Sequence, residues 1–152
     1  MTHTALRTAV VAALAFGAGL AVAHLPQPAR AAAAPLQPAV IDLAAITAAD
    51  LPTPTPVQPN LRTKQVFAAD GATGQIQIGT TVRHYHADAN EIQLVLSGSG
   101  TEWLGDKQIA LKPGMLIIIP AGTHHAGYTD PNLKLYAIKT PPQAPTDIHP
   151  VP

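Results

Sequence analysis

Four residues have the types and spacing of a mononuclear metal site: His84, His86, Glu91 and His125. Side chains two residues apart on a β-strand point to the same face, so His84 and His86 can present both imidazoles to one ion. Neutral imidazoles with one carboxylate suit divalent Fe, Mn, Ni, Cu or Zn, and the chain has no cysteine for a thiolate zinc site. The sequence therefore predicts one divalent transition metal per chain, with open positions for chemistry or ligand binding.

The segments around these residues are typical of β-strands separated by glycine or proline turns. Strands are predicted over residues 62–67, 75–86, 91–96, 101–104, 107–111, 116–119, 125–128 and 133–139. Counting back by twos from His84 along the second of them gives a mainly apolar face shared with the histidines, made of Val82, Thr80, Ile78 and Ile76. A closed antiparallel barrel hides its strand edges and encloses a cavity, so we predict an all-β barrel around the metal.

The spacing of these residues resembles the two sequence motifs of the cupin family. The first motif is matched by Gly79, His84, His86, Glu91 and Gly98, with a spacer one residue short after Gly79. The second motif is matched by Gly114, Pro120, Gly122 and His125, with Thr129 in place of the usual closing asparagine. The resemblance covers about residues 61–139 and implies a small, single-domain cupin of type 2. It implies one antiparallel jelly-roll barrel, or double-stranded β-helix, that carries the four ligands.

Two polar neighbours of the ligands are candidate catalytic residues. If Glu91 faces the ion, Gln93 lies on the same side of its strand and can orient a ligand or a bound molecule. His124 and His125 face opposite sides of a strand, and the two-residue gap after Gly122 selects His125 as the ligand. We expect His124 at the barrel mouth, as a proton shuttle if the site is an enzyme.

Function is less defined than the site. Cupins with similar motifs include dioxygenases, decarboxylases, isomerases and lyases. A three-histidine, one-glutamate site in an apolar surround favours a metal-dependent dioxygenase acting on a small molecule. Cupin lyases of dimethylsulfoniopropionate pair the metal with a tyrosine two residues beyond the glutamate, and Gln93 at that position argues against this activity.

Two interpretations without catalysis stay open. The chain could be a binding module for a metal or for a small ligand such as a sugar or organic acid. The absence of a clear general acid or base outside the ligand set favours the binding module, because Glu102 and Asp106 are expected on an outer face or in a turn. Alternatively, the ion has a purely structural role in stabilising the barrel, and its removal unfolds the protein.

The N-terminus has the pattern of a secretory signal peptide over residues 1–23. Arg7 precedes an Ala/Val/Leu/Gly run that ends in a small-x-small cleavage pattern, Ala21-Val22-Ala23. The run is shorter than the roughly 20 residues a spanning helix needs, which argues against a stable membrane anchor. No cysteine is present for a lipid anchor. We therefore expect a periplasmic or secreted protein.

The remaining segments are predicted as a Pro/Ala-rich extension or spacer (24–60), the barrel (61–140) and an irregular Pro-rich tail (141–152). Residues 40–46 are expected to form a short helix or edge strand that packs on the barrel or on a second subunit. The cupin resemblance allows a homodimer through such N-terminal strands. Without Arg7, the nine basic residues become eight against nine acidic ones, and no basic patch is evident, which argues against a nucleic-acid partner.

Overall fold

The computed structural model describes residues 35–69, 71–128 and 132–152. The predicted signal peptide, the start of the extension and the motif residue Thr129 lie outside the described residues. Strands dominate the described part, together with one short 3-10 helix: η1 (Ala48–Asp50), β1 (Leu61–Ala68), β2 (Thr73–Gly79), β3 (His84–Tyr85), β4 (Asn90–Ser97), β5 (Gly100–Leu104), β6 (Lys107–Leu111), β7 (Leu116–Ile119), β8 (His125–Tyr128), β9 (Lys134–Thr140) and β10 (His149–Pro150). No helix among the described residues is long and apolar enough to cross a membrane.

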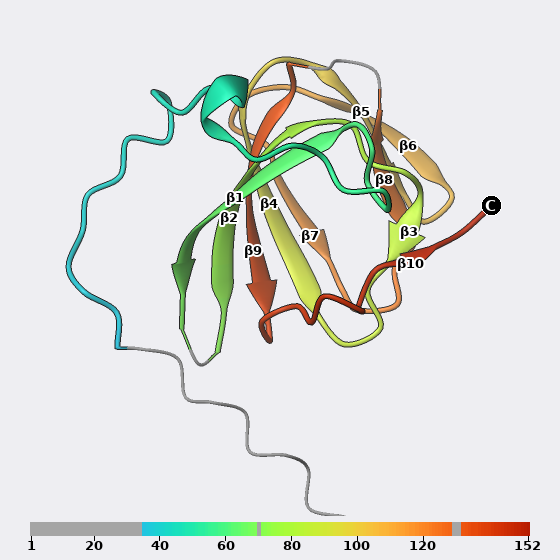
Figure 1. The fold of residues 1–152 in the computed structure, drawn as a ribbon. Coiled ribbons are helices and arrows are strands. Elements are labelled where there is room, and N and C mark those ends of the chain that lie inside the picture. The colour runs from blue at the N-terminus through green and yellow to red at the C-terminus, as the bar shows by residue number, and fades with distance from the viewer. Residues whose placement is uncertain (1–34, 70, 129–131) are drawn as a thin grey trace, which may run out of the picture. The chain divides into compact units, whose positions relative to one another are not determined.

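The strands form two five-stranded sheets, in the orders β1-β2-β9-β4-β7 and β10-β3-β8-β5-β6. Every pairing between these strands is antiparallel. Figure 1 shows the two sheets beside each other, with β9, β4 and β7 on one side and β3, β8 and β5 on the other. The crossed strand order within each sheet is that of a jelly roll. The predicted all-β, antiparallel barrel is confirmed.

Strand β4 shows how alternation places residues inside the barrel. Glu91, Gln93 and Val95 are buried, while the residues between them are partly exposed. In the register with β9, these three lie opposite Lys139, Ala137 and Leu135, respectively. Because opposite residues of an antiparallel pair share a face, the inner surface of β4 and β9 changes from polar to apolar along its length.

The single strand predicted over residues 75–86 is wrong. Strand β2 ends at Gly79, which has φ +118 and lies against the carbonyl oxygen of Asn60, so that a Cβ atom would overlap it. The backbone resumes as a strand only at His84. This break shifts the alternation, so Ile76 and Ile78 do not share the face of the histidines. Gln77 faces the metal cluster instead, with its amide on Glu91.

Two apolar clusters stabilise the barrel. One is made of Val95, Leu111, Ile117, Ile119, Leu133 and Leu135. The other joins Ile76 and Ile78 to Leu51, with Leu43 and Ile46 of the N-terminal extension packed against it. Lys134 fixes the same segment, because its ammonium group donates hydrogen bonds to backbone carbonyls at residues 43, 44 and 46, at 3.1, 2.9 and 2.7 Å. Part of the extension therefore belongs to the packed structure.

The C-terminal residues 141–152 are not a wholly irregular tail. Strand β10 pairs with β3, and His149 lies opposite Tyr85. Asp147 is buried, and its carboxylate accepts hydrogen bonds from the backbone N–H groups of Ala87 and Ala89 at 2.6 and 3.1 Å. This contact fixes the loop between His86 and Glu91.

Candidate metal centre

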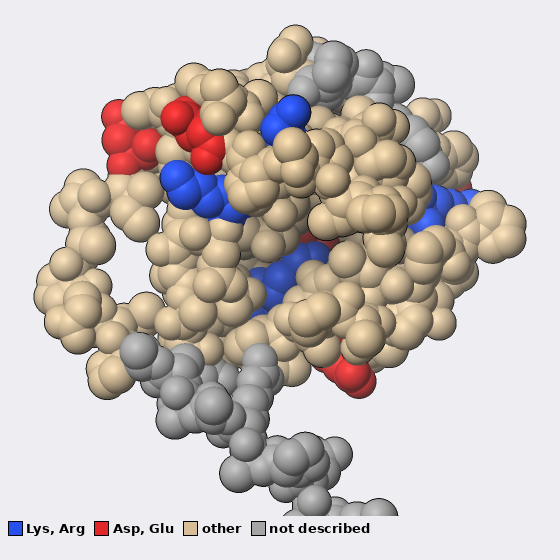
Figure 2. All heavy atoms as spheres, viewed as in Figure 1, with Lys and Arg blue, Asp and Glu red and all other residues tan. Residues whose placement is uncertain are grey.

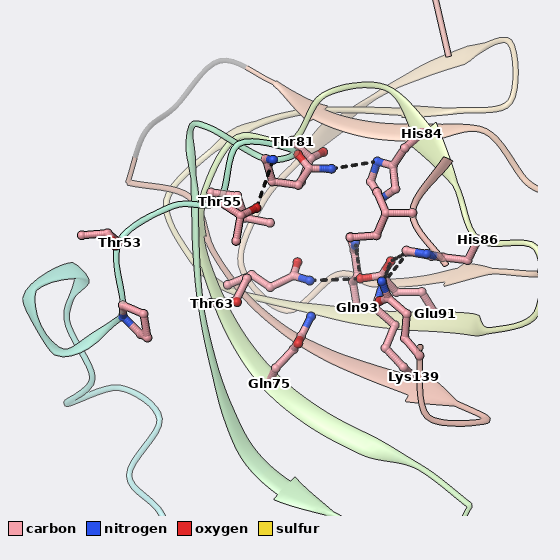
Figure 3. Close-up of a pocket in the computed structure, with 16 residues that line it drawn as sticks. Thr53, Thr55, Thr63, Gln75, Thr81, His84, His86, Glu91, Gln93 and Lys139 are labelled. Carbon is pink, nitrogen blue, oxygen red and sulfur yellow. Dashed lines mark hydrogen bonds and ion pairs between the residues drawn. The ribbon is translucent and has the colours of Figure 1, made fainter. Parts of the chain in front are cut away.

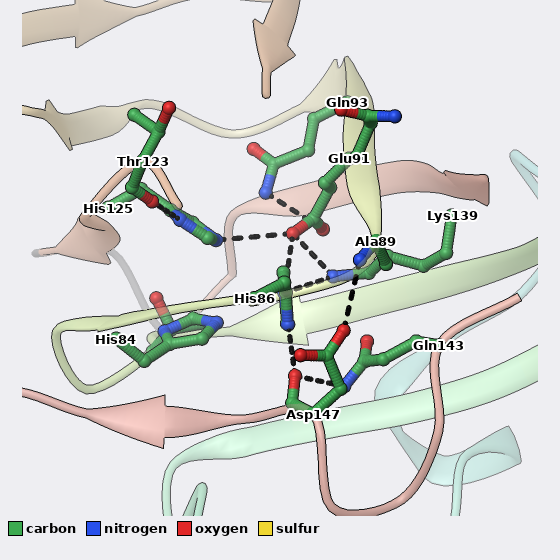
Figure 4. Close-up of polar contacts among 12 residues, drawn as sticks. His84, His86, Ala89, Glu91, Gln93, Thr123, His125, Lys139, Gln143 and Asp147 are labelled. Atoms are coloured by element: carbon green, nitrogen blue, oxygen red, sulfur yellow. Dashed lines mark hydrogen bonds and ion pairs between the residues drawn. The ribbon is translucent and has the colours of Figure 1, made fainter. Parts of the chain in front are cut away.

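The structure brings the four predicted ligands into one buried cluster. His84 comes from β3, His86 follows it, Glu91 comes from β4 and His125 begins β8. One ligand atom from each lies within 4.8 Å of the others, and all four residues are at most 4% exposed. Figure 4 shows the histidines around the Glu91 carboxylate. The fold thus brings together residues as far apart in the sequence as His84 and His125, which are separated by 41 positions.

Each histidine of the cluster uses its Nδ1–H group on a backbone carbonyl. The distances are 2.7 Å for His84 to Val82, 2.5 Å for His86 to Asp147 and 2.9 Å for His125 to Thr123. A histidine that donates from Nδ1 presents a lone pair on Nε2, which is the arrangement of most metal-binding imidazoles. Burial, and then the charge of His125, lowers the pKa of His84 to about 4, which keeps this imidazole neutral.

The Glu91 carboxylate is divided between two roles. Its Oε1 atom accepts hydrogen bonds from the side-chain amides of Gln77 and Gln93, at 3.2 and 3.1 Å. Its Oε2 atom lies 3.2 Å from Nε2 of both His86 and His125. Burial alone would raise the pKa of Glu91, but Lys139 and these histidines hold it well below its usual value. The carboxylate is therefore charged, with one oxygen directed at the histidines.

Lys139 places a positive charge inside the same cluster. It lies opposite Glu91 on β9, is 2% exposed, and its Nζ atom is 2.5 Å from Glu91 Oε2 and 2.6 Å from His86 Nε2. Burial lowers the pKa of Lys139, and the charge of Glu91 opposes this effect. Lys139 was not predicted from the sequence. The alternation along its strand could have indicated it, because Lys139 follows Leu135 and Ala137 at two-residue steps and so lies on the same inner face.

The donor set fits a metal ion. Imidazole lone pairs and a carboxylate oxygen are all acceptors, and acceptors at these distances repel one another unless a cation lies among them. The ammonium group of Lys139 acts as such a cation between Glu91 and His86. A divalent transition metal meets the same requirement with the nitrogen and oxygen ligands that it prefers.

A cavity of about 270 Å³ adjoins the cluster, and Figure 3 shows the side chains around it. Most of its lining is neutral and polar, from glutamine and threonine: Gln58, Gln75, Gln77, Gln93, Gln143, Thr53, Thr55, Thr63 and Thr81. By residue type, the lining is therefore more polar than the apolar surround that was expected. Among the described lining residues, only Lys139 is ionisable besides members of the four-residue cluster. Figure 2 shows basic atoms deep in a hollow on a largely uncharged face.

The two candidate catalytic residues lie in different places. Gln93 lines the cavity and contacts Glu91. His124 is exposed and is not among the lining residues; its ring stacks on Tyr85, with ring centroids 5.3 Å apart. The ring of His149 also stacks on Tyr85, at 4.8 Å. A catalytic role stays a prediction for both candidates.

Glu102 is buried, which corrects the outer-face prediction. It lies opposite Gly127 on β8, two residues along from His125, so it points into the barrel. It is 1% exposed, and neither carboxylate oxygen has a hydrogen-bond partner among the described residues. Burial, and then the charge of Glu91, raises the pKa of Glu102 to about 8, so the group is mainly neutral at pH 7. Asp106 is exposed in the turn between β5 and β6, as predicted.

Comparisons with known proteins agree with this fold. The model of the cupin domain, Cupin_2, matches residues 73–138. KdgF from Halomonas sp. is similar in structure, with a TM-score of 0.52 and 21% identity over 57% of this chain and 85% of that one. A variant of Streptomyces PAC13 with uridine has a TM-score of 0.56 and 15% identity, over 70% of this chain and 88% of that one. TT1209 from Thermus thermophilus has a TM-score of 0.53 and 19% identity, covering 68% and 97%. No curated protein matches the chain.

Residues 73–138 of the chain therefore match a cupin domain. The match is to the type 2 cupin model, the family that the spacing of the histidine and glycine motifs predicted. At these identities the solved structures establish the fold alone. The buried cluster of His84, His86, Glu91 and His125 supports a metal-binding cupin.

Proposed function

We propose that this chain is an exported cupin enzyme that holds one divalent transition metal and acts on a small molecule. The observation that carries the proposal is the convergence of three histidine side chains and the Glu91 carboxylate beside a cavity. His84, His86, Glu91 and His125 are the proposed ligands. A metal ion bound there would supply Lewis-acid polarisation of a substrate oxygen or, as iron or copper, chemistry with dioxygen.

The surrounding residues prepare the ligands for this role. Backbone carbonyls fix the histidine tautomers, and Gln77 and Gln93 hold Glu91 Oε1 so that Oε2 faces the histidines. Such contacts to ligand side chains set their orientation and their basicity. Gln93 also faces the cavity, where it can orient a bound molecule.

The polar cavity supports chemistry on a hydrophilic substrate. Amide and hydroxyl groups line it, so a substrate enters an environment that can replace its hydrogen bonds to water. A dioxygenase remains one candidate reaction, although the many amide and hydroxyl groups of the lining weaken the argument from an apolar surround. Isomerisation, decarboxylation and elimination use the same Lewis-acid role of an ion.

A binding protein without catalysis is the second candidate. The favouring observation is that no carboxylate other than Glu91 lines the cavity among the described residues. Lys139 is paired with Glu91, and Glu102 is not a lining residue. Among the described lining residues outside the four-residue cluster, Lys139 is then the one ionisable group that could transfer a proton, and His124 could do so only from outside the cavity.

Metal loading followed by turnover tests the proposal. We expect the purified chain to take up close to one equivalent of Fe, Mn, Ni, Cu or Zn, and His84→Ala to lose this binding. His124→Ala should keep the metal, and should lose turnover if His124 is the proton shuttle. His149→Ala is a matched control, because its ring also stacks on Tyr85 but does not adjoin a ligand. Metal uptake without turnover of any ligand that binds would favour the binding protein.

Export is part of the proposal and has its own test. The signal-like residues 1–23 predict cleavage before His24. We expect N-terminal sequencing of the protein from its own cell envelope or medium to begin at or shortly after this position. An uncleaved chain in the cytoplasm would contradict the export proposal and leave the metal site unaffected.

A further inference from the structure

Two buried carbonyl oxygens beside the metal cluster have no hydrogen-bond donor. They are Oε1 of Gln77 and Oε1 of Gln93, and neither has a partner among the described residues. Both side chains are buried, at 4% and 3% exposure, and both line the cavity. Native proteins rarely leave buried acceptors unpaired, so these two atoms point to a missing donor.

The orientation of both amides is fixed by Glu91. Each Nε2 group donates to Glu91 Oε1, at 3.2 Å from Gln77 and 3.1 Å from Gln93. Turning either amide over would place its carbonyl oxygen against a charged carboxylate oxygen, and two acceptors repel. The residues therefore present acceptors, and not donors, to whatever else contacts them.

Fixed acceptors select the chemistry of the ligand. A hydroxyl group donates one hydrogen bond and also accepts, so it satisfies a carbonyl oxygen and still pairs with other groups. A carboxylate has no donor and would leave both carbonyl oxygens unpaired. Gln77 of β2 and Gln93 of β4 are held by the same carboxylate oxygen, so their two carbonyl oxygens belong to neighbouring side chains. This arrangement suits a molecule with at least two hydroxyl groups near each other.

The rest of the lining favours the same class of ligand. Five glutamines and four threonines line the cavity, and these neutral groups both donate and accept. No arginine is among the described lining residues, and the single lysine is paired with Glu91. The volume of about 270 Å³ lies just below the roughly 300 Å³ at which typical ligand pockets begin, which limits the ligand to a small molecule.

We infer that the cavity binds a small polyhydroxylated molecule, a monosaccharide or polyol, whose hydroxyl groups donate to Gln77 and Gln93. The inference rests on the proposed function, because it names the ligand class of the same site. It assigns Gln77 to ligand recognition and gives Gln93 the same role.

Three probes separate hydroxyl recognition from carboxylate recognition. Xylose has hydroxyls only, glucuronate has hydroxyls and a carboxylate, and cyclohexanecarboxylate has a carboxylate only. Titration calorimetry of the purified chain, both metal-loaded and metal-free, should show binding of xylose and glucuronate and little binding of cyclohexanecarboxylate. Equal or tighter binding of cyclohexanecarboxylate, or binding of none of the three, would overturn the inference.

Variants then test the two carbonyl groups. Gln77→Met and Gln93→Met keep the side-chain length and remove the whole amide, both the carbonyl acceptor and the donor to Glu91, and each should weaken xylose binding about tenfold. Gln65→Met is the matched control, because Gln65 is an exposed glutamine of β1 outside the cavity lining. Circular dichroism and thermal unfolding identify any variant that has lost its fold. Unchanged xylose binding in both folded glutamine variants would show that water alone satisfies the carbonyls, against the inference.

The outcome for the metal is read separately. Metal content of the same samples tests the proposed function, and xylose binding to metal-free protein tests the ligand class. A chain that binds xylose but no metal contradicts the proposed function only. A chain that binds metal but only the carboxylates contradicts the inference only.

Discussion

The two ends of the barrel interior differ sharply although the same strands build both. At the polar end, Glu91 lies opposite Lys139, and the three histidines converge on this pair. At the apolar end, four residues along the same two strands, Val95 lies opposite Leu135 within a cluster of buried aliphatic side chains. Alternation assigns both sets to the inner face, so the chemistry of each layer depends only on which residue stands there.

The difference between the two ends shows how the barrel can keep charges inside. The apolar end stabilises the fold by removing aliphatic surface from water, at about 25 cal/mol per Å². The polar end works against this, because a buried charge costs several kcal/mol unless a partner or a metal compensates it. Each buried charge at the polar end must therefore have a partner of opposite charge, whereas the aliphatic side chains at the apolar end need none. Substitutions at the two ends should consequently fail in different ways.

Removing the charge of Glu91 should have the largest effect on the polar end. Glu91→Gln leaves the ammonium of Lys139 without its counter-ion, and it replaces the ligand oxygen by a neutral amide. We expect a loss of about 3–5 kcal/mol in unfolding free energy and at least about a hundredfold loss of metal affinity. Urea unfolding and metal titration measure the two effects. Glu102→Gln is the matched control and should keep its metal affinity. An equal loss of metal affinity in Glu102→Gln would show that the effect is not specific to Glu91.

Replacing Lys139 should separate the ammonium from the metal. In Lys139→Met without metal, Glu91 is left unpaired, and we expect a loss of about 3–5 kcal/mol in unfolding free energy. With metal, most of this loss should be recovered, because the ion compensates the carboxylate. Metal affinity should rise about tenfold or more, since the ion no longer displaces a cation 2.5 Å from Glu91. Weaker metal binding in this variant would mean that Lys139 supports the ion instead of competing with it.

Glu102 should make the stability of the metal-free protein pH-dependent. Its pKa rises from the ordinary value of 4.5 to about 8 on folding, so the native state binds the extra proton between these values. Its stabilising contribution is complete below the unfolded pKa and is lost as pH rises through the folded pKa. Between about pH 5.5 and pH 7.5 we expect a loss of roughly 2–3 kcal/mol.

Glu102→Gln is the control for this pH dependence. The variant should lack the slope and should be more stable than the wild type at about pH 8. Urea unfolding across this pH range measures the difference. Parallel pH profiles for the two proteins would contradict the raised pKa.

The apolar end should respond least and without any effect on metal. Val95→Ala removes two buried methyl groups from the aliphatic cluster, and we expect a loss of about 2 kcal/mol in unfolding free energy. Metal affinity and its pH dependence should be unchanged. A change in metal affinity here would show that the two ends are coupled through packing, and the contrast between them would fail.

Most of the fold was predictable from sequence because periodicity and turns are local. The alternation of Glu91, Gln93 and Val95, and the glycine and proline turns, correctly predicted most strands of the barrel. The histidine spacing and Glu91 predicted the cluster that the structure brings together. The break at Gly79 was missed, because a strand interruption depends on the close approach of Asn60 from another segment.

The missed site residues depend on contacts between distant segments. Lys139 reaches Glu91 across 48 positions, and Asp147 reaches the loop after His86 across about 60. No local pattern in a proline-rich terminus indicates that a carboxylate there accepts hydrogen bonds from a loop beside the metal cluster. Glu102 was placed outside because its strand is short and its phase relative to His125 is set by the pairing of β5 with β8.

Native mass spectrometry after metal loading tests the central claim most directly. The wild-type chain, stripped with a chelator and then supplied in turn with Fe, Mn, Ni, Cu and Zn, should retain one ion per chain for at least one metal. His84→Ala and Glu91→Gln should retain none under the same conditions. A wild-type chain that holds no metal near one equivalent, or variants that hold as much as the wild type, would contradict the assignment of His84, His86, Glu91 and His125 as a metal centre.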